Sequence, residues 1–457
     1  MRSATNIGKE MKTLYWLTHD LRLDDNPCIA RAAASESLIM VYCINPRWFS
    51  PFRYHLPSLG THRWNFLQES ISDFNRSLLD LGQRLLVVYQ RPEIALCELI
   101  DLHKIERLCV SRQFGYDEIE ALRYIGKTRP ELVIEQVDSY TLFDDLLEKE
   151  KTPFNQGKWP STFSQFRRKA EQLVVPDPRP IPAALPPSPL NTAQSTRVLQ
   201  RPDWVPSPSS SGCEFRGGEN AAEKHLSDYL SGDLPLHYKE VRNSLDGWEN
   251  SSKMSPWLNS GCLSPRRLKA AISDYEEKNY ANDSTEWLFV ELLWREYFQW
   301  TALRLGTGLF SFKGTAKASP LTSYYPERFQ KWCFGGTPYP LVNACMNQLA
   351  ETGYLSNRGR QIAASCLVNE LEVDWRHGAA WFEHQLVDYD VAANWGNWQY
   401  IAGVGADPRG GRHFNLDKQT EMFDSDGRYR QRWVKVPGNA VLDTRDAADW
   451  PIDIGET

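Results

Sequence analysis

The residues with the clearest chemical potential lie at positions 388–400, which read Asp-Tyr-Asp-Val-Ala-Ala-Asn-Trp-Gly-Asn-Trp-Gln-Tyr in a region otherwise patterned as buried helix. Buried carboxylates and amides are costly unless a polar group meets them. A planar, polar, redox-active ligand would be such a partner, and the neighbouring tryptophans would offer a path for electrons. Upstream, Arg360 could pair with Asp388. The alternative is a purely structural buried salt bridge.

A second constellation surrounds Glu291. Glu291 and Trp294 are three residues apart, so they share a face if this segment is helical. A carboxylate beside an indole could hold a flat pyrimidine, with the ring stacked on Trp294 and its edge bonded to the acid. Spacing alone favours a simpler interpretation, a partly exposed acid paired with Arg295 on an amphipathic helix.

A third candidate is the hydroxyl-rich turn Ser251–Ser255, which leads into Pro256. Proline suits the first position of a helix. The N–H groups and the dipole of such a helix could meet a diphosphate. The alternative is an ordinary serine N-cap.

The elements that must position these residues differ between the two parts of the chain. The first 140 residues alternate short β-branched runs with helical segments, which predicts a doubly wound parallel sheet. No G-x-G-x-x-G follows the first strand, so the usual dinucleotide site is not expected. The longest predicted helix there is Thr61–Leu81. The predicted strands are Thr13–Leu17, Ser37–Ile44, Arg84–Gln90, Arg107–Arg112 and Leu132–Asp138.

The chain turns helical after a proline-rich stretch at 173–212, and Thr285–Leu305 is the clearest predicted helix. The predicted organisation has five parts, an α/β domain followed by an all-α domain, with flanking and connecting segments. These are a disordered lead-in (1–11), the α/β domain (12–140), an inter-domain linker (141–214), the helical domain (215–435) and a short tail (436–457).

Composition narrows the class of protein. The chain has 457 residues, 41% hydrophobic and 24% charged, with a net charge of −6, so any contact with nucleic acid must come from a local basic patch. The nine cysteines are scattered without a Cys-x-x-Cys, which argues against a disulfide framework or a metal site and for a reducing, cytoplasmic setting. No apolar run of 18 residues or secretory signal is present, so a membrane is not expected as partner.

Together the motifs resemble the flavin site of the photolyase/cryptochrome family. Two neighbouring segments are similar in sequence to the DASH cryptochromes. They are Asn-Trp-Gly-Asn-Trp-Gln-Tyr at 394–400 and Gly-Val-Gly-Ala-Asp-Pro-Arg at 403–409. The resemblance covers residues 12–435. It implies a photolyase-type α/β antenna domain followed by an all-α domain that binds FAD.

The resemblance also assigns roles around the flavin. Arg360 and Asp388 would form an ion pair over the isoalloxazine, Asp390 would meet its N3/O2 side, and Asn394 would face N5. Tyr238 and the Ser251–Ser255 turn would hold the phosphates. The predicted cofactor residues are Tyr238, Ser251, Ser252, Lys253, Met254, Ser255, Glu291, Arg295, Asn357, Arg360, Asp388, Asp390 and Asn394.

By the same resemblance the substrate is a cyclobutane pyrimidine dimer, and Glu291, Trp294, Asn394 and Tyr400 are the predicted catalytic residues. Tyr400 stands where photolyases of double-stranded DNA typically carry a tryptophan, and it offers a smaller stacking surface. Because flipping a dimer out of a duplex costs a few kcal/mol, roughly, this favours dimers in single strands.

Trp398 and Trp375 match the first two members of the family's electron relay. The third, normally a surface tryptophan, aligns with Thr322 in this chain. Candidates for a substitute are Tyr324, Tyr325 and Trp332.

The DNA-facing side chains and the antenna are the remaining expectations. Folate-binding relatives usually offer a glutamate where this chain has Gln113 or Phe114, and 5,10-methenyltetrahydrofolate is the expected antenna. Each basic cluster could equally be solvated surface. The predicted DNA-facing residues are Arg266, Arg267, Lys269, Gln361, Arg409, Arg412 and His413.

The leading function is therefore blue-light-dependent repair of pyrimidine dimers in single-stranded DNA by a monomer, with RNA or duplex DNA as weaker partners. A rival is a blue-light photoreceptor that binds DNA or a partner protein and regulates. A third is a light-independent α/β nucleotide-binding protein, which a flavin-free purified protein would favour.

Overall fold

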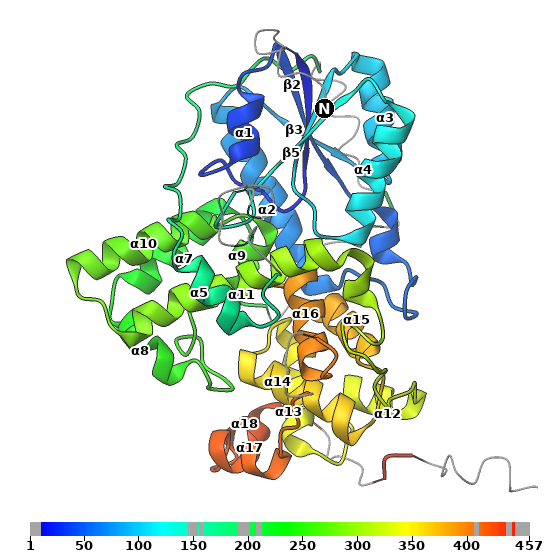
Figure 1. The fold of residues 1–457 in the computed structure, drawn as a ribbon, viewed down its shortest axis with the longest axis vertical. Helices are drawn as coiled ribbons and strands as arrows, with labels where there is room; N and C mark the ends of the chain where they lie inside the picture. Colours follow the sequence, from blue (N-terminus) through cyan, green and yellow to red (C-terminus); the bar gives the residue numbers. More distant parts are fainter. Residues whose placement is uncertain are drawn as a thin grey trace, which may run out of the picture.

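The computed structural model describes residues 11–144, 146, 154, 159–190, 202–203, 205–206, 213–405, 411–435 and 441–443. A parallel sheet flanked by helices forms the N-terminal part, and helices form the remainder (Figure 1). None of the described helices is long and apolar enough to cross a bilayer. The predicted lead-in at 1–11 lies outside the described residues except for Met11.

Five parallel strands form the sheet in the order β3-β2-β1-β4-β5, and each ends within two residues of its predicted bounds. Side chains alternate between the two faces of β1. Leu14 and Trp16 pack under α3 and α4, whereas Tyr15 and Leu17 pack on the side of α1 and α2. Helices therefore cover both faces, as the doubly wound prediction requires. The strands are β1 (Lys12–Leu17), β2 (Ser37–Cys43), β3 (Leu85–Val88), β4 (Arg107–Ser111) and β5 (Val133–Val137).

The helices of the N-terminal part are short apart from α2, which contains the predicted Thr61–Leu81 segment except its last residue. Gly60, before α2, lies against the backbone carbonyl of His384, so any side chain there would clash with the helical part. The bounds are α1 (Pro27–Ala32), η1 (Pro46–Phe49), α2 (Thr61–Asp80), α3 (Pro92–His103) and α4 (Tyr116–Thr128).

The C-terminal part is built around α11, the longest helix. Its N-terminus is closed by a capping box, in which the Asn282 side chain and Thr285 each satisfy the other's backbone N–H. The helices are α7 (Glu219–Leu230), α8 (Leu234–Val241), α9 (Ser255–Ser260), α10 (Pro265–Lys278), α11 (Asp283–Leu305), η2 (Gly306–Phe310), α12 (Pro326–Cys333), α13 (Pro340–Thr352), α14 (Asn357–Ser365), η3 (Cys366–Glu370), α15 (Trp375–Gln385), α16 (Val391–Ile401), α17 (Leu416–Phe423) and α18 (Arg428–Trp433).

The segment predicted as a linker is partly structured. Helix α5 (Phe163–Ala170) lies within it, and Phe163 and Phe166 pack their rings on Tyr297 of α11. Residues 173–190 have no regular secondary structure and run back along the α/β part. There the Asp25 N–H donates to the Arg179 carbonyl, and the Arg179 N–H donates to the Asp25 carboxylate. In the predicted tail, Asp443 pairs with Arg328 of α12 at 2.7 Å.

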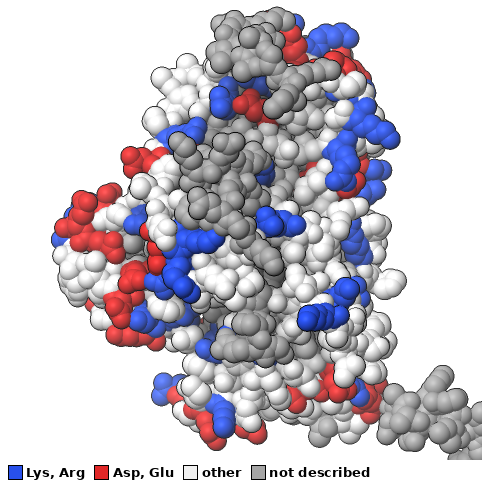
Figure 2. All heavy atoms as spheres, in the orientation of Figure 1, with Lys and Arg blue, Asp and Glu red and all other residues white. Residues whose placement is uncertain are grey.

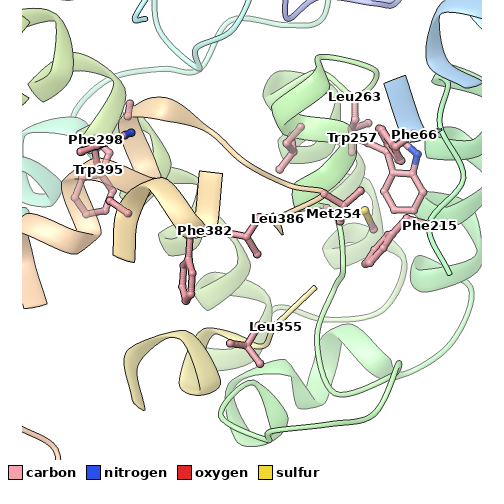
Figure 3. Packing of buried hydrophobic residues seen from close by; sticks show 14 of the residues in the cluster. Phe66, Phe215, Met254, Trp257, Leu263, Phe298, Leu355, Phe382, Leu386 and Trp395 are labelled. Carbon is pink, nitrogen blue, oxygen red and sulfur yellow. The ribbon is translucent and has the colours of Figure 1, made fainter. Parts of the chain in front are cut away.

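Buried hydrophobic side chains join the two parts into one core (Figure 3). Phe66 of α2 meets Trp257 of α9 with ring centroids 6.1 Å apart, and Phe215 lies beside them. Buried acids reinforce this junction, because the Glu219 carboxylate accepts the backbone N–H groups of Leu23 and Asp24 at 2.8 Å each. The helical part is therefore held rigidly against the sheet.

Candidate active site

A cavity of about 640 Å³ opens between α8, α10, α11, α14 and α16 in the helical part. Its size falls within the range of small-molecule and cofactor sites. All of the residues predicted to contact the cofactor line this cavity, although they come from segments far apart in the chain. The residues predicted to contact the dimer line it as well, namely Glu291, Trp294, Asn394 and Tyr400, together with Trp398, Gln361 and Arg412.

The ion pair between Arg360 and Asp388 forms at one wall. The Arg360 Nη2 atom lies 2.7 and 2.9 Å from the two carboxylate oxygens of Asp388. The Ser255 hydroxyl donates to the same carboxylate at 2.6 Å. Burial alone would lower the pKa of Arg360, but the charge and hydrogen bond of Asp388 together with the nearby Tyr354 outweigh burial, and the pKa is raised. The pair is thereby fixed to the start of α9.

Asp390 has a structural role that spacing did not predict. It is the N-cap of α16, where it accepts the N–H of Ala393 at 2.7 Å. Its other oxygen accepts the hydroxyl of Tyr140 and the amide of Gln299 at 2.6 Å each. The Asp390 carboxylate therefore already accepts these three hydrogen bonds, and any contact with the flavin edge would be an additional one. One turn later, the Asn394 amide donates to the Ala379 carbonyl at 3.0 Å, which orients it at the cavity wall.

The turn at Ser251–Ser255 borders the cavity as predicted. Lys253 adopts a left-handed φ of 54° and places its ammonium 4.5 Å from the ring of Tyr354. Helix α9 then begins at Ser255, so Pro256 is its second residue and not its first. Cation and hydroxyl groups thus lie together at this end of the cavity.

Glu291 is not paired with Arg295, which corrects the simpler interpretation of its spacing. Its carboxylate lies 2.5 Å from Arg242 of the segment after α8 and accepts the indole N–H of Trp287 at 2.9 Å. Burial raises the pKa of Glu291, while Arg242 and Trp287 oppose this shift. Arg295 instead lies over the ring of Tyr140 at 4.0 Å.

Arg295 carries a buried polar atom that the described residues leave unsatisfied. Its Nη1 donates to the Tyr140 carbonyl at 2.6 Å, but its Nε has no hydrogen-bond partner in the described part of the chain. Buried polar groups of proteins are almost always satisfied. Because Arg295 lines the cavity, this unpaired donor is consistent with a polar ligand there.

Aromatic side chains form the opposite wall. The rings of Trp294 and Tyr400 meet edge to face, with centroids 6.3 Å apart. The Arg412 guanidinium lies 4.9 Å from the centre of the Tyr400 ring and donates to its hydroxyl. Phe163 of α5 stacks on Trp294 with ring centroids 3.7 Å apart and an interplanar angle of 11°, so the linker segment holds this tryptophan in place.

Several predicted DNA-facing residues are paired within the protein, and one of them is buried. Arg266 is 2% exposed and pairs with Asp144, so the prediction that it faces DNA is wrong. Arg267 forms a two-bonded pair with Asp24, and His413 lies 2.6 Å from Glu370. The reason is that α10 packs against the α/β part, whose acids meet its arginines. Lys269 donates to Ser273 at 2.6 Å, and Arg409 lies outside the described residues.

The residues considered for the antenna are also engaged within the protein. The Gln113 amide donates to the Thr18 hydroxyl at 2.9 Å and to the Ser111 carbonyl. Phe114 is buried against Tyr140, with ring centroids 5.9 Å apart. Nearby, burial raises the pKa of Glu118 to about 7.

Several site residues were missed by sequence reasoning. Arg242 and Trp287 had a local signal, since they lie four residues from Tyr238 and Glu291 respectively and helical neighbours meet at that spacing. Phe163 and Tyr140 had none, because they contact the lining residues Trp294 and Asp390 from segments that precede the helical domain. Arg358 lies beside the cavity, where burial and then Arg242 and Arg412 lower its pKa.

The donor set fits FAD. A buried ion pair, an amide and hydroxyl-bearing turn residues surround a cavity whose apolar lining includes Leu258, Phe298 and Ile401. The ion pair and Asn394 would hold a flavin ring, while Lys253 and the serines of its turn would hold phosphates. The fold and this site define a photolyase-type flavoprotein.

Comparison with known proteins agrees. Residues 13–187 match the family model described as DNA photolyase, and residues 287–448 match the one described as FAD binding domain of DNA photolyase. The chain is 46% identical over 440 residues to a cryptochrome DASH of Idiomarina loihiensis, covering 96% of each chain. It is 45% identical to a cryptochrome DASH of Vibrio parahaemolyticus, covering 96% of this chain and 97% of that one. The chain belongs to the DASH cryptochromes of the photolyase/cryptochrome family, and FAD is its cofactor.

Solved structures share the fold. The structure of a Synechocystis cryptochrome superposes with a TM-score of 0.85 at 37% identity, covering 93% of this chain and 89% of that chain. A bacterial class III photolyase from Agrobacterium tumefaciens superposes with a TM-score of 0.76 at 25% identity, covering 94% and 88%.

Proposed function

We propose that this protein uses blue light to repair cyclobutane pyrimidine dimers, preferentially in single-stranded DNA. The observation that carries this proposal is that Glu291, Trp294 and Tyr400 share one cavity with the residues suited to hold FAD. Bound FAD supplies the light-driven electron transfer that opens the dimer ring. The protein supplies position, exclusion of water and electrostatics.

Glu291 is suited to hold the edge of a pyrimidine. A pyrimidine carbonyl only accepts hydrogen bonds, so it needs a donor from the protein. Burial raises the pKa of Glu291 toward the protonated form that can donate, and Arg242 and Trp287 oppose this shift. Trp287 and Arg242 fix the carboxyl group in place.

Trp294 and Tyr400, whose rings meet edge to face, would both contact the flipped dimer, and their size bears on the choice of strand. Flipping a dimer out of a duplex costs roughly a few kcal/mol, whereas a single strand presents it already unpaired. Tyr400 offers less stacking surface than a tryptophan. In addition, Arg412 already engages the Tyr400 ring. Stacking in this cavity therefore compensates less of the flipping cost.

The predicted contact with nucleic acid depends on a small group of arginines and not on the whole surface. Figure 2 shows basic side chains in separate groups with acidic ones between them on the face drawn there. Burial and the neighbouring charges of Arg242 and Arg412 lower the pKa of Arg358, so these three arginines lie close together. Such a local positive charge at the cavity suits the phosphates beside a flipped dimer.

Replacing Arg412 with alanine should weaken binding of a single-stranded oligonucleotide. The slope of the logarithm of the binding constant against the logarithm of the salt concentration should become shallower by about 0.7 for each phosphate that is no longer neutralised. The measurement is a binding titration across a salt series. Arg428→Ala is the matched control, because Arg428 is 86% exposed on α18 and its removal takes away the same charge. Equal weakening in both variants would show that Arg412 does not bind the oligonucleotide specifically.

The direct test of function presents one thymine-dimer oligonucleotide first single-stranded and then as a duplex, under blue light. We expect repair of the single strand and little repair of the duplex. Efficient repair of both would overturn the role given to Tyr400. Repair of neither, with FAD bound and photoreducible, would favour the rival function of a blue-light photoreceptor that binds DNA or a partner protein.

Three further proposals concern the oligomeric state, the cellular compartment and the antenna of the protein. We propose that the protein acts as a monomer in the cytoplasm and that it carries a folate antenna, 5,10-methenyltetrahydrofolate. The scattered cysteines support the reducing compartment, since the described ones are all free and all but Cys213 are buried. Release of a folate on denaturation would test the antenna.

A further inference from the structure

Trp375 of α15 and Trp395 of α16 form a pair of rings in contact, and Trp398 of α16 packs on α15 one turn from Trp375. The outer edge of the Trp398 ring lies directly over Gly378, so that any side chain at Gly378 would collide with it. Trp375 precedes Gly378 by three residues on α15 and shares its face. The rings of Trp375 and Trp395 then meet edge to face, with centroids 5.8 Å apart.

The pair of Trp375 and Trp395 reaches the surface at Tyr54. The Tyr54 ring centroid is 6.2 Å from that of Trp395, and the side chain is half-buried. Tyr54 belongs to the loop between η1 and α2, drawn in blue, which reaches past the sheet to α15 (Figure 1). Tyr54 and His55 have φ values of 55° and 57°, a strained arrangement for two non-glycine residues that persists only where the surroundings hold it.

Trp395 has a proton acceptor that Trp375 lacks. Its indole N–H donates to the Tyr389 hydroxyl at 3.2 Å, and the Glu383 carboxylate interacts with both groups. The N–H of Trp375 instead meets the backbone carbonyl of Phe312 at 2.9 Å. An indole that has lost an electron is a strong N–H acid, so a neighbouring carboxylate favours oxidation of Trp395.

The other candidates for the missing third relay residue are less well connected. Trp332 contacts Trp398 at 6.1 Å, but it is fully buried and its other ring contacts are to phenylalanines. Tyr324 is exposed, yet its ring contacts within the described chain are to His377 and Phe329. Phenylalanine and histidine are far harder to oxidise than tryptophan or tyrosine, so both routes are interrupted. Tyr325 lies under the Arg328 guanidinium at 4.5 Å, where the positive charge opposes loss of an electron.

We infer that Tyr54 is the terminal electron donor of this chain, reached from Trp398 through Trp375 and Trp395, and that it replaces the surface tryptophan absent at Thr322. The inference rests on the proposed function, in which light reduces bound FAD. Trp398 gives one electron to the light-excited flavin and is refilled in turn by Trp375, Trp395 and Tyr54. Tyr54 releases its phenolic proton to water, and a soluble thiol then returns one electron and one proton to the tyrosyl radical.

The test compares three conservative variants of the FAD-loaded protein: Tyr54→Phe, Tyr324→Phe and Trp332→Phe. Each is illuminated with dithiothreitol as reductant, and transient absorption follows the tryptophan and tyrosyl radicals. We expect Tyr54→Phe to lose the tyrosyl signal and to photoreduce several-fold more slowly, with both other variants unchanged. A normal signal and rate in Tyr54→Phe would overturn the inference, as would their loss in Tyr324→Phe.

A second readout separates this inference from the proposed function. When the flavin is first reduced chemically with dithionite, repair needs no electron from the relay, so Tyr54→Phe should repair a dimer as well as the unmodified protein does. Slower repair under these conditions would assign Tyr54 a different role and overturn the inference. Absence of repair in the unmodified protein would count against the proposed function alone, because the radical measurements do not depend on DNA.

Discussion

Replacing Glu291 with alanine should reduce dimer repair on the order of 10²-fold while FAD stays bound. Glu291 lines the same cavity as Trp294 and Tyr400, so the variant removes the donor that we propose for the pyrimidine carbonyl. The measurement is repair of a single-stranded dimer by chemically reduced protein under steady light, with the flavin-to-protein ratio as the control for folding.

Glu291→Gln is the informative companion variant. Glutamine has nearly the same volume and keeps a donor for the carbonyl, but it cannot carry the charge that pairs with Arg242. We expect it to retain more repair than alanine does. If both variants repair dimers normally, Glu291 only anchors Arg242 and the substrate contact is wrong.

Replacing Asp388 with alanine should abolish stable retention of FAD. Arg360 would remain in the cavity wall with its countercharge removed, and leaving one partner of a buried ion pair unpaired destabilises by about 3–5 kcal/mol. The Ser255 hydroxyl would lose its acceptor in the same variant, which loosens the start of α9 where the phosphates are expected. The measurement is the flavin absorbance per protein after desalting, together with the melting temperature.

A matched variant distinguishes loss of the flavin site from loss of the fold. Asp424 is 2% exposed and pairs with Arg430 at 2.6 Å, outside the cavity. Asp424→Asn should lower the melting temperature and leave the flavin content unchanged. Should Asp388→Ala keep its full flavin content, the ion pair would be structural and its assignment to the cofactor would fail.

Local patterns in the sequence were sufficient for much of the architecture. The strands were predictable because runs of β-branched residues separated by helical segments are characteristic of parallel α/β folds. The shared face of Glu291 and Trp294 was predictable for a similar reason, since it follows from the period of a single helix. The motif at 388–400 and its resemblance to known flavin sites predicted a set of cofactor residues, and the structure gathers these residues around one cavity.

In contrast, tertiary structure decided which oppositely charged residue each buried or half-buried ionic side chain pairs with. The sequence placed Arg266 among exposed cations, but packing of α10 on the α/β part buries it against Asp144. Spacing suggested Arg295 as the partner of Glu291, whereas the approach of α8 provides Arg242. The local sequence pattern is compatible with either ion-pair partner in both cases. Only the folded chain determines which opposite charge lies nearest.

The aromatic residues of the cavity and the proposed electron route to the surface also combine features predicted from the sequence with contacts that depend on the fold. Through its resemblance to the family, the sequence predicted Trp398 and Trp375 as relay residues and Thr322 as the position where the third tryptophan is missing. It could not reveal that Phe163 covers Trp294 or that Tyr54 lies beside Trp395, because each pair joins segments far apart in the chain. The period of a helix or strand is written into neighbouring residues, but contacts between distant segments arise only when the whole core packs.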